Sequence, residues 1–447
     1  MTPRVKTGPA PGRRPRMHAR VLPALLAMLA VLAGCGSTLS AGSGAHVIAA
    51  VDPSSASAPK SCSTAVLETL SDVLQRVYRE GVASERTGSA EYLITHSAAL
   101  VAAVELGNKP AARAAAKALL ATGHVTNLSI TRDAKPFISL GGAALAPIHG
   151  TLEGASGAPI ASYVASVWAD NGFLIEGAGI TQGLVALRQD GRYIASSAPL
   201  TAEVPTDEGT LTQEHVTYQY TSLPAQAYPS GALRIYLLMP TSSIAPVCAA
   251  TRQDTAVDAL RRVAKLIYTG ESGPSAQKQV RRVQRNQPLL QAVAHDEPEA
   301  TRLAIDALLH QHIVRLRVSA GGQLLSDVGG PYVLAPVTAP LDRAGHRIGS
   351  LALSIQDDEG YLRLSRRLAG LDVLMYMSGG GSGEGSPAQP KLVKDSLGPA
   401  PGPALSAVPA SGAFSYEGHA YSVFTVHAKA FPTGPLTIRV LVPNPYL

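Results

Sequence analysis

The sequence has few cysteines and few aromatic residues. Only 3 cysteines, 1 tryptophan and 5 phenylalanines occur in 447 residues. No Cys-x-x-Cys pair is present, so neither a cysteine-rich disulfide scaffold nor a clustered cysteine metal site is expected. The length suffices for two or three domains of ordinary size, each with its own core.

Catalytic signatures are also missing. The chain has no Gly-x-Ser-x-Gly, His-Glu-x-x-His or Gly-x-x-x-x-Gly-Lys motif, so we expect no enzyme activity and no cofactor. His310 and His312 could form a metal site at the start of a strand, but no acidic or cysteine partner is near them in sequence. Histidines of the surface or core are the preferred interpretation, and no metal is expected.

Net positive charge is confined to the first residues. Six basic residues and no acidic residue precede Cys35, and they account for the formal net charge of +6. The remainder is close to neutral, which argues against a nucleic-acid-binding surface. No later run reaches the length of a membrane-spanning helix, which needs about 18 apolar residues.

The first 34 residues are typical of an export signal. A basic segment precedes the apolar run Val21–Leu32, and the string Leu32-Ala33-Gly34-Cys35 resembles a bacterial lipobox. This resemblance implies cleavage before Cys35 and lipidation of its thiol, which would place the protein on the outer face of the cell membrane. Two alternatives stay open: a plain signal peptide with an incidental cysteine, and a true start at Met17.

The next segment, residues 35–61, is rich in Ser, Ala and Gly and is expected to be a flexible tether. Cys62 and Cys248 then remain outside the anchor. Cysteines of an exported protein usually pair, so we predict a disulfide between them. Two separate buried thiols are the alternative.

Segments of the first half recur in the second half at an offset of 188 to 189 residues. Leu145-Ala146-Pro147 recurs as Leu334-Ala335-Pro336, and the end of the first copy, residues 228–235, matches residues 431–438. The repeat predicts two copies of one fold, over 62–245 and 248–447. The Gly-, Pro- and Ser-rich stretch 378–405 occurs in the second copy only and is expected to be a mobile surface loop.

Each copy begins with helical periodicity and continues with strands. Opening helices are predicted from residue 67 and from residue 257. A second helical stretch follows over 98–120 and over 288–309, with breaks near 107–110 and 296–298, and the apolar period then changes to two. A short helix is expected after Asp170 and Asp358, capped by the carboxylate. The predicted fold class is α+β, with N-terminal helices packed on an antiparallel sheet in each unit.

The segment Tyr332 to Ile355 resembles the Cache family, the extracytoplasmic PAS-like sensor domains of bacterial receptors. Its Ala335-Pro336-Val337 leads through a Gly turn to Ile348-Gly349, and Gly349 is expected to let its strand pass close over a neighbour. The resemblance implies tandem Cache-like units with ligand pockets on the open face of the sheet. The positions so implied are Gly329, Gly330, Tyr332, Asp357, Asp358 and Tyr361, with Trp168, Asp170 and Phe173 in the first copy.

Core packing is the competing interpretation of these aromatic residues. The resulting hypothesis is a lipid-anchored sensory protein that binds a small molecule or a transmembrane receptor's outer domain. The alternative is a non-catalytic scaffold lipoprotein with degenerate pockets.

Overall fold

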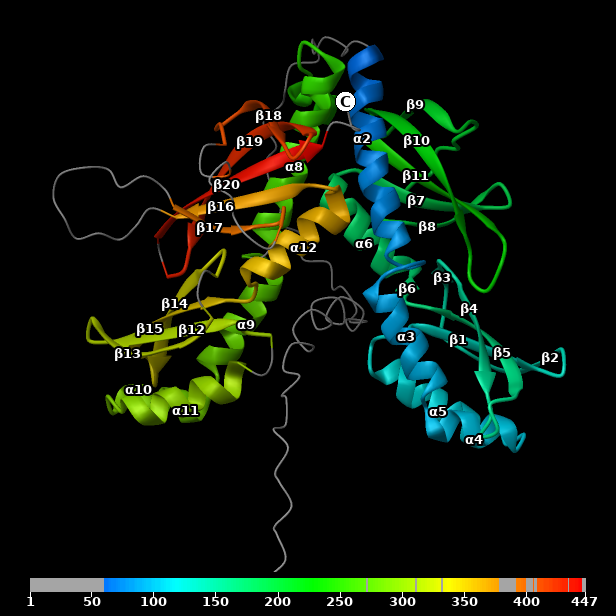
Figure 1. The fold of residues 1–447 in the computed structure, drawn as a ribbon, viewed down its shortest axis with the longest axis horizontal. Helices are drawn as coiled ribbons and strands as arrows, with labels where there is room; N and C mark the ends of the chain where they lie inside the picture. The colour runs from blue at the N-terminus through cyan, green and yellow to red at the C-terminus, as the bar shows by residue number, and fades with distance from the viewer. Residues whose placement is uncertain are drawn as a thin grey trace, which may run out of the picture.

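The computed structural model describes residues 60–270, 272–309, 312–330, 333–377, 391–398, 405, 408–432 and 434–443. Cys35, the signal segment and most of the tether lie outside these residues, as do His310 and Tyr332. The fold is α+β with antiparallel sheets, and the chain forms two tandem units, as predicted (Figure 1).

The first unit begins with one long helix, followed by three shorter helices and two sheets. Its helices are α2 (Lys60–Arg79), α3 (Glu85–Thr95), α4 (Ala98–Glu105), α5 (Lys109–Ala121) and α6 (Asp170–Thr181). Its strands are β1 (Asn127–Arg132), β2 (Lys135–Leu140), β3 (Ala144–Leu145), β4 (Ile148–Glu153), β5 (Pro159–Ser166), β6 (Trp168–Ala169), β7 (Leu184–Gln189), β8 (Arg192–Ser196), β9 (Glu208–Gln213), β10 (Val216–Gln226) and β11 (Ala232–Pro240).

The second unit repeats this order after α7 (Thr241–Ile244) and a 3-10 turn (Ala245–Val247). Its helices are α8 (Arg252–Gly270), α9 (Pro274–Gln284), α10 (Gln287–Ala294), α11 (Pro298–Leu309) and α12 (Asp358–Ala369). Its strands are β12 (Arg315–Ala320), β13 (Gln323–Gly329), β14 (Val337–Arg343), β15 (His346–Ser354), β16 (Asp372–Met377), β17 (Lys391–Asp395), β18 (Gly412–Tyr416), β19 (His419–Ala430) and β20 (Gly434–Pro443).

Each unit contains two large sheets, where the sequence pattern predicted one, and the first unit also has the two-stranded sheet β3-β6. The four-stranded sheets run β2-β1-β5-β4 and β13-β12-β15-β14, and the five-stranded sheets run β8-β7-β11-β10-β9 and β17-β16-β20-β19-β18. In all four, the first strand lies between the second strand and the last. Helix α6 or α12 connects the two sheets of its unit, so the short helix expected after Asp170 and Asp358 is where the second sheet begins.

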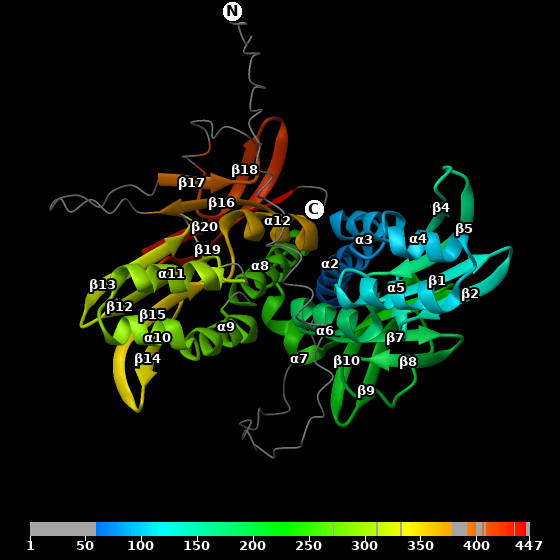
Figure 2. The ribbon, with the colours of Figure 1, turned by 90° about the horizontal axis from the view of Figure 1, so that it is seen from below.

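The two long helices lie side by side at the centre of the molecule, with one unit on each side (Figures 1 and 2). They are amphipathic: Leu70, Leu74 and Val77 of α2, and Leu260 and Val263 of α8, are buried. Each long helix covers the inner face of its unit's five-stranded sheet, while the shorter helices α4, α5, α10 and α11 pack on the four-stranded sheets.

The repeat extends to details of the backbone. Ala146 and Ala335 both have positive φ, at 56° and 48°. Ser166 donates a hydrogen bond from its hydroxyl to the Leu145 carbonyl, and Ser354 does the same to the carbonyl of Leu334. Equivalent side chains therefore hold the same turn in both units.

Two local predictions are confirmed and one is wrong in part. Cys62 and Cys248 form a disulfide, with their Cα atoms 5.6 Å apart. An added Cβ at Gly349 would lie 2.4 Å from the Ser319 carbonyl oxygen, so this strand does pass close to its neighbour. The stretch 378–405 is not all loop, because β17 pairs with β16 and Leu405 is buried.

Candidate functional site

The ligand-site residues predicted in the first unit lie in its core. Trp168 and Phe173 are buried with their ring centroids 6.2 Å apart, and Tyr78 of α2 packs edge-on against Phe173. The Trp168 indole N–H donates to the carbonyl of Val77 at 3.3 Å. A Cβ at Gly81 would lie 2.3 Å from the Trp168 ring, so the space around that ring is filled by the protein's own atoms.

Asp170 lies beside these rings as the first residue of α6. It does not cap the helix, because the N-cap residue is Ala169, and its Oδ1 has no hydrogen-bond partner in the described part of the chain. Burial raises the pKa of Asp170 to about 6.

In the second unit, Tyr361 is the equivalent of Phe173. It is buried, donates to the Ala264 carbonyl of α8 at 3.3 Å and packs edge-on against Tyr268. Asp358, the equivalent of Asp170, is 4% exposed, and its Oδ1 also has no partner among the described residues. Burial, together with the neighbouring Asp357 carboxylate, raises the pKa of Asp358 to about 8.

The other predicted positions of the second unit have structural contacts. Asp357 caps α12 by accepting a hydrogen bond from the Gly360 amide at 2.6 Å. Gly329 has a φ of 134° where β13 passes Arg315, and the Gly330 carbonyl accepts from the Arg315 guanidinium at 3.0 Å. Tyr332 lies outside the described residues. The binding role of these positions stays a prediction: the two best-formed pockets both lie in the first unit and are lined by other residues.

A cluster of charges joins the two units beside Trp168. Arg367 of α12 forms an ion pair with Glu80, which follows α2. Arg86 of α3 lies with its guanidinium carbon 4.8 Å from the Trp168 ring centroid and is 8% exposed. Burial, and then the charge of Arg367, lower the pKa of Arg86 to about 10, while burial raises the pKa of Glu176 nearby. This cluster is part of the contact between units.

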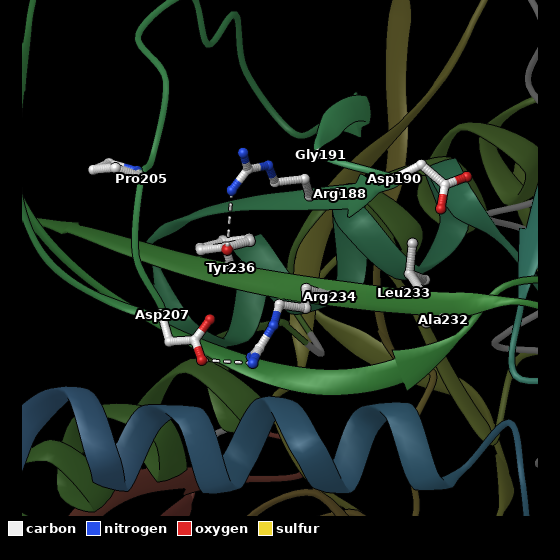
Figure 3. Close-up of a pocket in the computed structure, with 9 residues that line it drawn as sticks. All are labelled: Arg188, Asp190, Gly191, Pro205, Asp207, Ala232, Leu233, Arg234 and Tyr236. Carbon is white, nitrogen blue, oxygen red and sulfur yellow. Dashed lines mark hydrogen bonds and ion pairs between the residues drawn. The ribbon is translucent and has the colours of Figure 1, made fainter.

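One of the two best-formed hollows among the described residues lies elsewhere, on the outer face of the first unit's five-stranded sheet (Figure 3). Its volume is about 280 Å³. It lies between β7, β11 and the segment 197–207 that crosses this face. Its lining residues are Arg188, Asp190, Gly191, Pro205, Asp207, Ala232, Leu233, Arg234 and Tyr236.

Strand register brings two arginines together in this pocket. Arg188 of β7 and Arg234 of β11 are directly opposite each other in the antiparallel ladder, and Tyr236 lies two residues along β11 on the same face. Arg234 donates to the Asp207 carboxylate at 2.5 Å and to the Ser222 hydroxyl at 3.0 Å. The Arg234 and Asp207 side chains are 41% and 61% exposed.

Arg188 makes its hydrogen bonds to uncharged groups. It donates to the Val204 carbonyl at 2.6 Å and to the Tyr236 hydroxyl at 3.5 Å. The bond to Tyr236 and the charge of Glu203 raise the pKa of Arg188. Within the described part of the chain, Arg188 has no ion pair.

Sequence reasoning missed this pocket, although the repeat contained a signal. When 228–235 is matched to 431–438, Arg234 corresponds to Thr437, and the shared offset of 188 places Arg188 on Tyr376. The structure confirms that Tyr376 and Thr437 are cross-strand partners in the second unit, as Arg188 and Arg234 are in the first. A search for charged residues present in one copy only would have selected this pair.

The described residues were also compared with the requirements of a metal site and of a membrane-spanning helix. They contain no group of three or more His, Cys, Asp or Glu side chains that could hold a metal ion. His312 is described, and burial lowers its pKa. Nor does any described helix combine the length and apolar character needed to cross a membrane.

Comparison with known proteins adds a single remote similarity. No family model and no curated protein matches the chain. A solved structure described as an extracellular ligand binding receptor from Desulfohalobium retbaense DSM5692 is similar at 10% sequence identity, with a TM-score of 0.21. The similarity covers 52% of this chain and 47% of that chain, and at this TM-score it supports no argument about function.

Proposed function

We propose that this protein is an exported, lipid-anchored protein that binds a small molecule without catalysis, in the manner of an extracytoplasmic sensor domain. The observation that carries the proposal is the pocket of the first unit, where Arg188, Arg234 and Tyr236 line one face of a rigid sheet. A concave surface with a few convergent polar groups is the usual form of a ligand site.

The resemblance to Cache domains supports a sensory role. The segment that carries it, residues 332–355, lies across β14 and β15, and each unit has helices packed on antiparallel sheets, as the resemblance implies. We propose that the protein presents its ligand state to a transmembrane receptor, because the described residues contain no membrane-spanning helix through which it could signal directly.

The anchor belongs to the same proposal. Lipidation at Cys35 would attach the two units to the outer face of the cell membrane, and stable attachment requires more than one acyl chain. Replacing Cys35 with serine should release the protein from the membrane fraction of cells grown with a radiolabelled fatty acid, and the label should be lost. Equal labelling of the C35S variant would rule out this anchor.

Ligand binding is tested by thermal unfolding of the full chain against organic acids, amino acids, amines and nucleobases. A ligand at 100 times its dissociation constant stabilises the folded state by about 2.7 kcal/mol. A melting shift with at least one compound class supports the proposal. The absence of any shift, together with no crosslinked receptor, would refute it.

A scaffold role is the second candidate function. The observation that favours it is the filled space around Trp168, Phe173 and Tyr361, because these rings pack against α2 and α8 where a ligand was expected. Under this alternative, crosslinking on intact cells would capture a specific protein partner, while no small molecule would change the melting temperature.

A further inference from the structure

We propose that the pocket of the first unit binds an anionic group, a carboxylate or a phosphate, between Arg188 and Arg234, and that the second unit has lost this site. The inference rests on the proposed ligand-binding function and names the class of ligand. It requires no bond to be made or broken.

The first support is the unfavourable placement of the two guanidinium groups. Like charges directly opposite each other on one face of an antiparallel sheet destabilise it. Arg188 and Arg234 occupy such a pair of positions, on a face that also holds the buried rings of Tyr220 and Tyr236. Asp207 neutralises Arg234, but Arg188 bonds only to neutral groups. Asp190 also lines the pocket and the charge of Glu203 raises the pKa of Arg188, but neither forms an ion pair with Arg188 among the described residues, so Arg188 can still accept an anionic partner.

The second support is that the pocket is already formed. Gln213 accepts hydrogen bonds from the Thr201 and Ala202 amides at 2.7 and 3.2 Å and donates to the Pro199 carbonyl at 2.9 Å. Val204, further along the same segment, is fully buried. These contacts fix the segment on the sheet, so a ligand meets a wall that does not have to be ordered first.

The two arginines differ in how available they are. Arg188 is held by the Val204 carbonyl, which fixes its guanidinium over the sheet (Figure 3). Arg234 reaches the solvent-exposed Asp207, and an exposed ion pair of this kind contributes little to stability. An incoming carboxylate or phosphate can therefore replace Asp207 as the partner of Arg234 at small cost, with the geometry that a guanidinium offers such groups.

The second unit is an internal reference. At the equivalent positions Tyr376 and Thr437 replace the two arginines, and the Tyr376 hydroxyl bonds to the carbonyl of the buried Leu405, as Arg188 bonds to that of Val204. The link between sheet and crossing segment is thus kept in both units. The second unit also keeps one guanidinium there, because Arg439, at the position equivalent to Tyr236, lies with its Cζ 4.6 Å from the Tyr376 ring centroid. Only the first unit has a cross-strand pair of arginines beside this link, so the second cation is not needed for the fold.

The test uses three single variants of the full chain and isothermal titration at low ionic strength. The probes are succinate, citrate and inorganic phosphate, with putrescine and glucose as cationic and neutral comparators. Arg234→Gln should weaken anion binding by about tenfold or more, since a charge-assisted bond is lost. Asp207→Asn should strengthen it by about threefold to tenfold, because the competing carboxylate is gone. Arg343→Gln, an exposed arginine of β14, removes the same charge elsewhere and should leave affinity unchanged.

The outcomes separate this inference from the proposed function. Opposite effects of R234Q and D207N support the anion site, and their decline with added salt would agree with it. A fall in affinity in both variants would show that the ion pair is a structural part of the pocket and would overturn the inference. If only the cation putrescine or the neutral sugar glucose binds, the anion site is overturned but the ligand-binding function is kept. Binding of none of these probes would overturn the anion site and leave the ligand-binding function to be decided by the thermal screen and the crosslinking.

Discussion

Replacing the buried carboxyl Asp358 with asparagine should stabilise the protein at neutral and alkaline pH. Asp358 is 4% exposed, and its pKa is raised from 3.8 to about 8 by burial and by Asp357. The folded state therefore keeps this proton up to about pH 8, whereas the unfolded chain loses it near pH 4. Between these values unfolding releases a proton, so stability falls as pH rises, and the loss is complete above pH 8.

The size of the effect follows from the shift. Each pKa unit corresponds to about 1.36 kcal/mol, so a shift of about four units makes the ionised carboxylate cost on the order of 5 kcal/mol. Asparagine has nearly the same shape and never ionises. D358N should equal the wild type near pH 4 and exceed it most above pH 8.

The equivalent Asp170 provides a matched control. Burial raises its pKa to about 6, so the same reasoning gives a cost of about 3 kcal/mol for the ionised carboxylate. The wild-type stability should therefore stop falling near pH 6 as far as Asp170 is concerned. Urea unfolding followed by far-UV circular dichroism from pH 4 to pH 9 would measure both variants. A wild-type stability that does not fall over this range, or a D170N gain as large as that of D358N, would refute the reasoning.

Two further predictions concern stability. Replacing Cys62 and Cys248 with alanine should lower the free energy of unfolding by about 5 kcal/mol, because the disulfide closes a loop of sequence separation 186. In urea titrations the reduced wild type should unfold at the same midpoint as this variant. A variant midpoint equal to that of the oxidised wild type would contradict the prediction. Gly349→Ala should cost about 1 to 3 kcal/mol by forcing β15 away from Ser319, whereas Gly434→Ala, where a Cβ meets nothing within 4 Å, should cost less in the same titration.

The sequence predicted the parts of the fold that depend on local pattern and on the repeat. The breaks between α4 and α5 and between α10 and α11 fall at the expected turns, where Asn108 caps α5 and Pro298 is the first residue of α11. The disulfide followed from cysteine use in an exported chain. These predictions depend on residues close together in the sequence or on comparison of the two repeats.

The division of each unit into two sheets could not be predicted in the same way. Alternating strands look alike whether they join one sheet or two, and the choice depends on long-range pairing, such as β1 with β5 and β7 with β11. The short helices α3 and α9 were missed for a related reason. Their cap and packing, such as Ser84 at the start of α3, become evident only once the turn after the long helix is known.

The predicted site illustrates another limit of sequence pattern. The resemblance to Cache domains implied ligand-site roles for Trp168, Phe173 and Tyr361, yet aromatic residues near a carboxylate also arise when a helix buries its first turn against a core. What distinguishes the two is the space left over, and the Val77 carbonyl already accepts the Trp168 N–H. The arginine pair was missed because cross-strand partners are far apart in sequence.

The packing of the two units explains why one pocket can differ from its counterpart. Helix α12 packs on α2 and α6 packs on α8, which is the reciprocal arrangement of a two-fold dimer, and the disulfide joins the starts of the two long helices. In a dimer of identical chains, any change in one pocket appears in both. A tandem repeat keeps the reciprocal contact while each copy varies, so the first unit can retain Arg188 and Arg234 where the second has Tyr376 and Thr437.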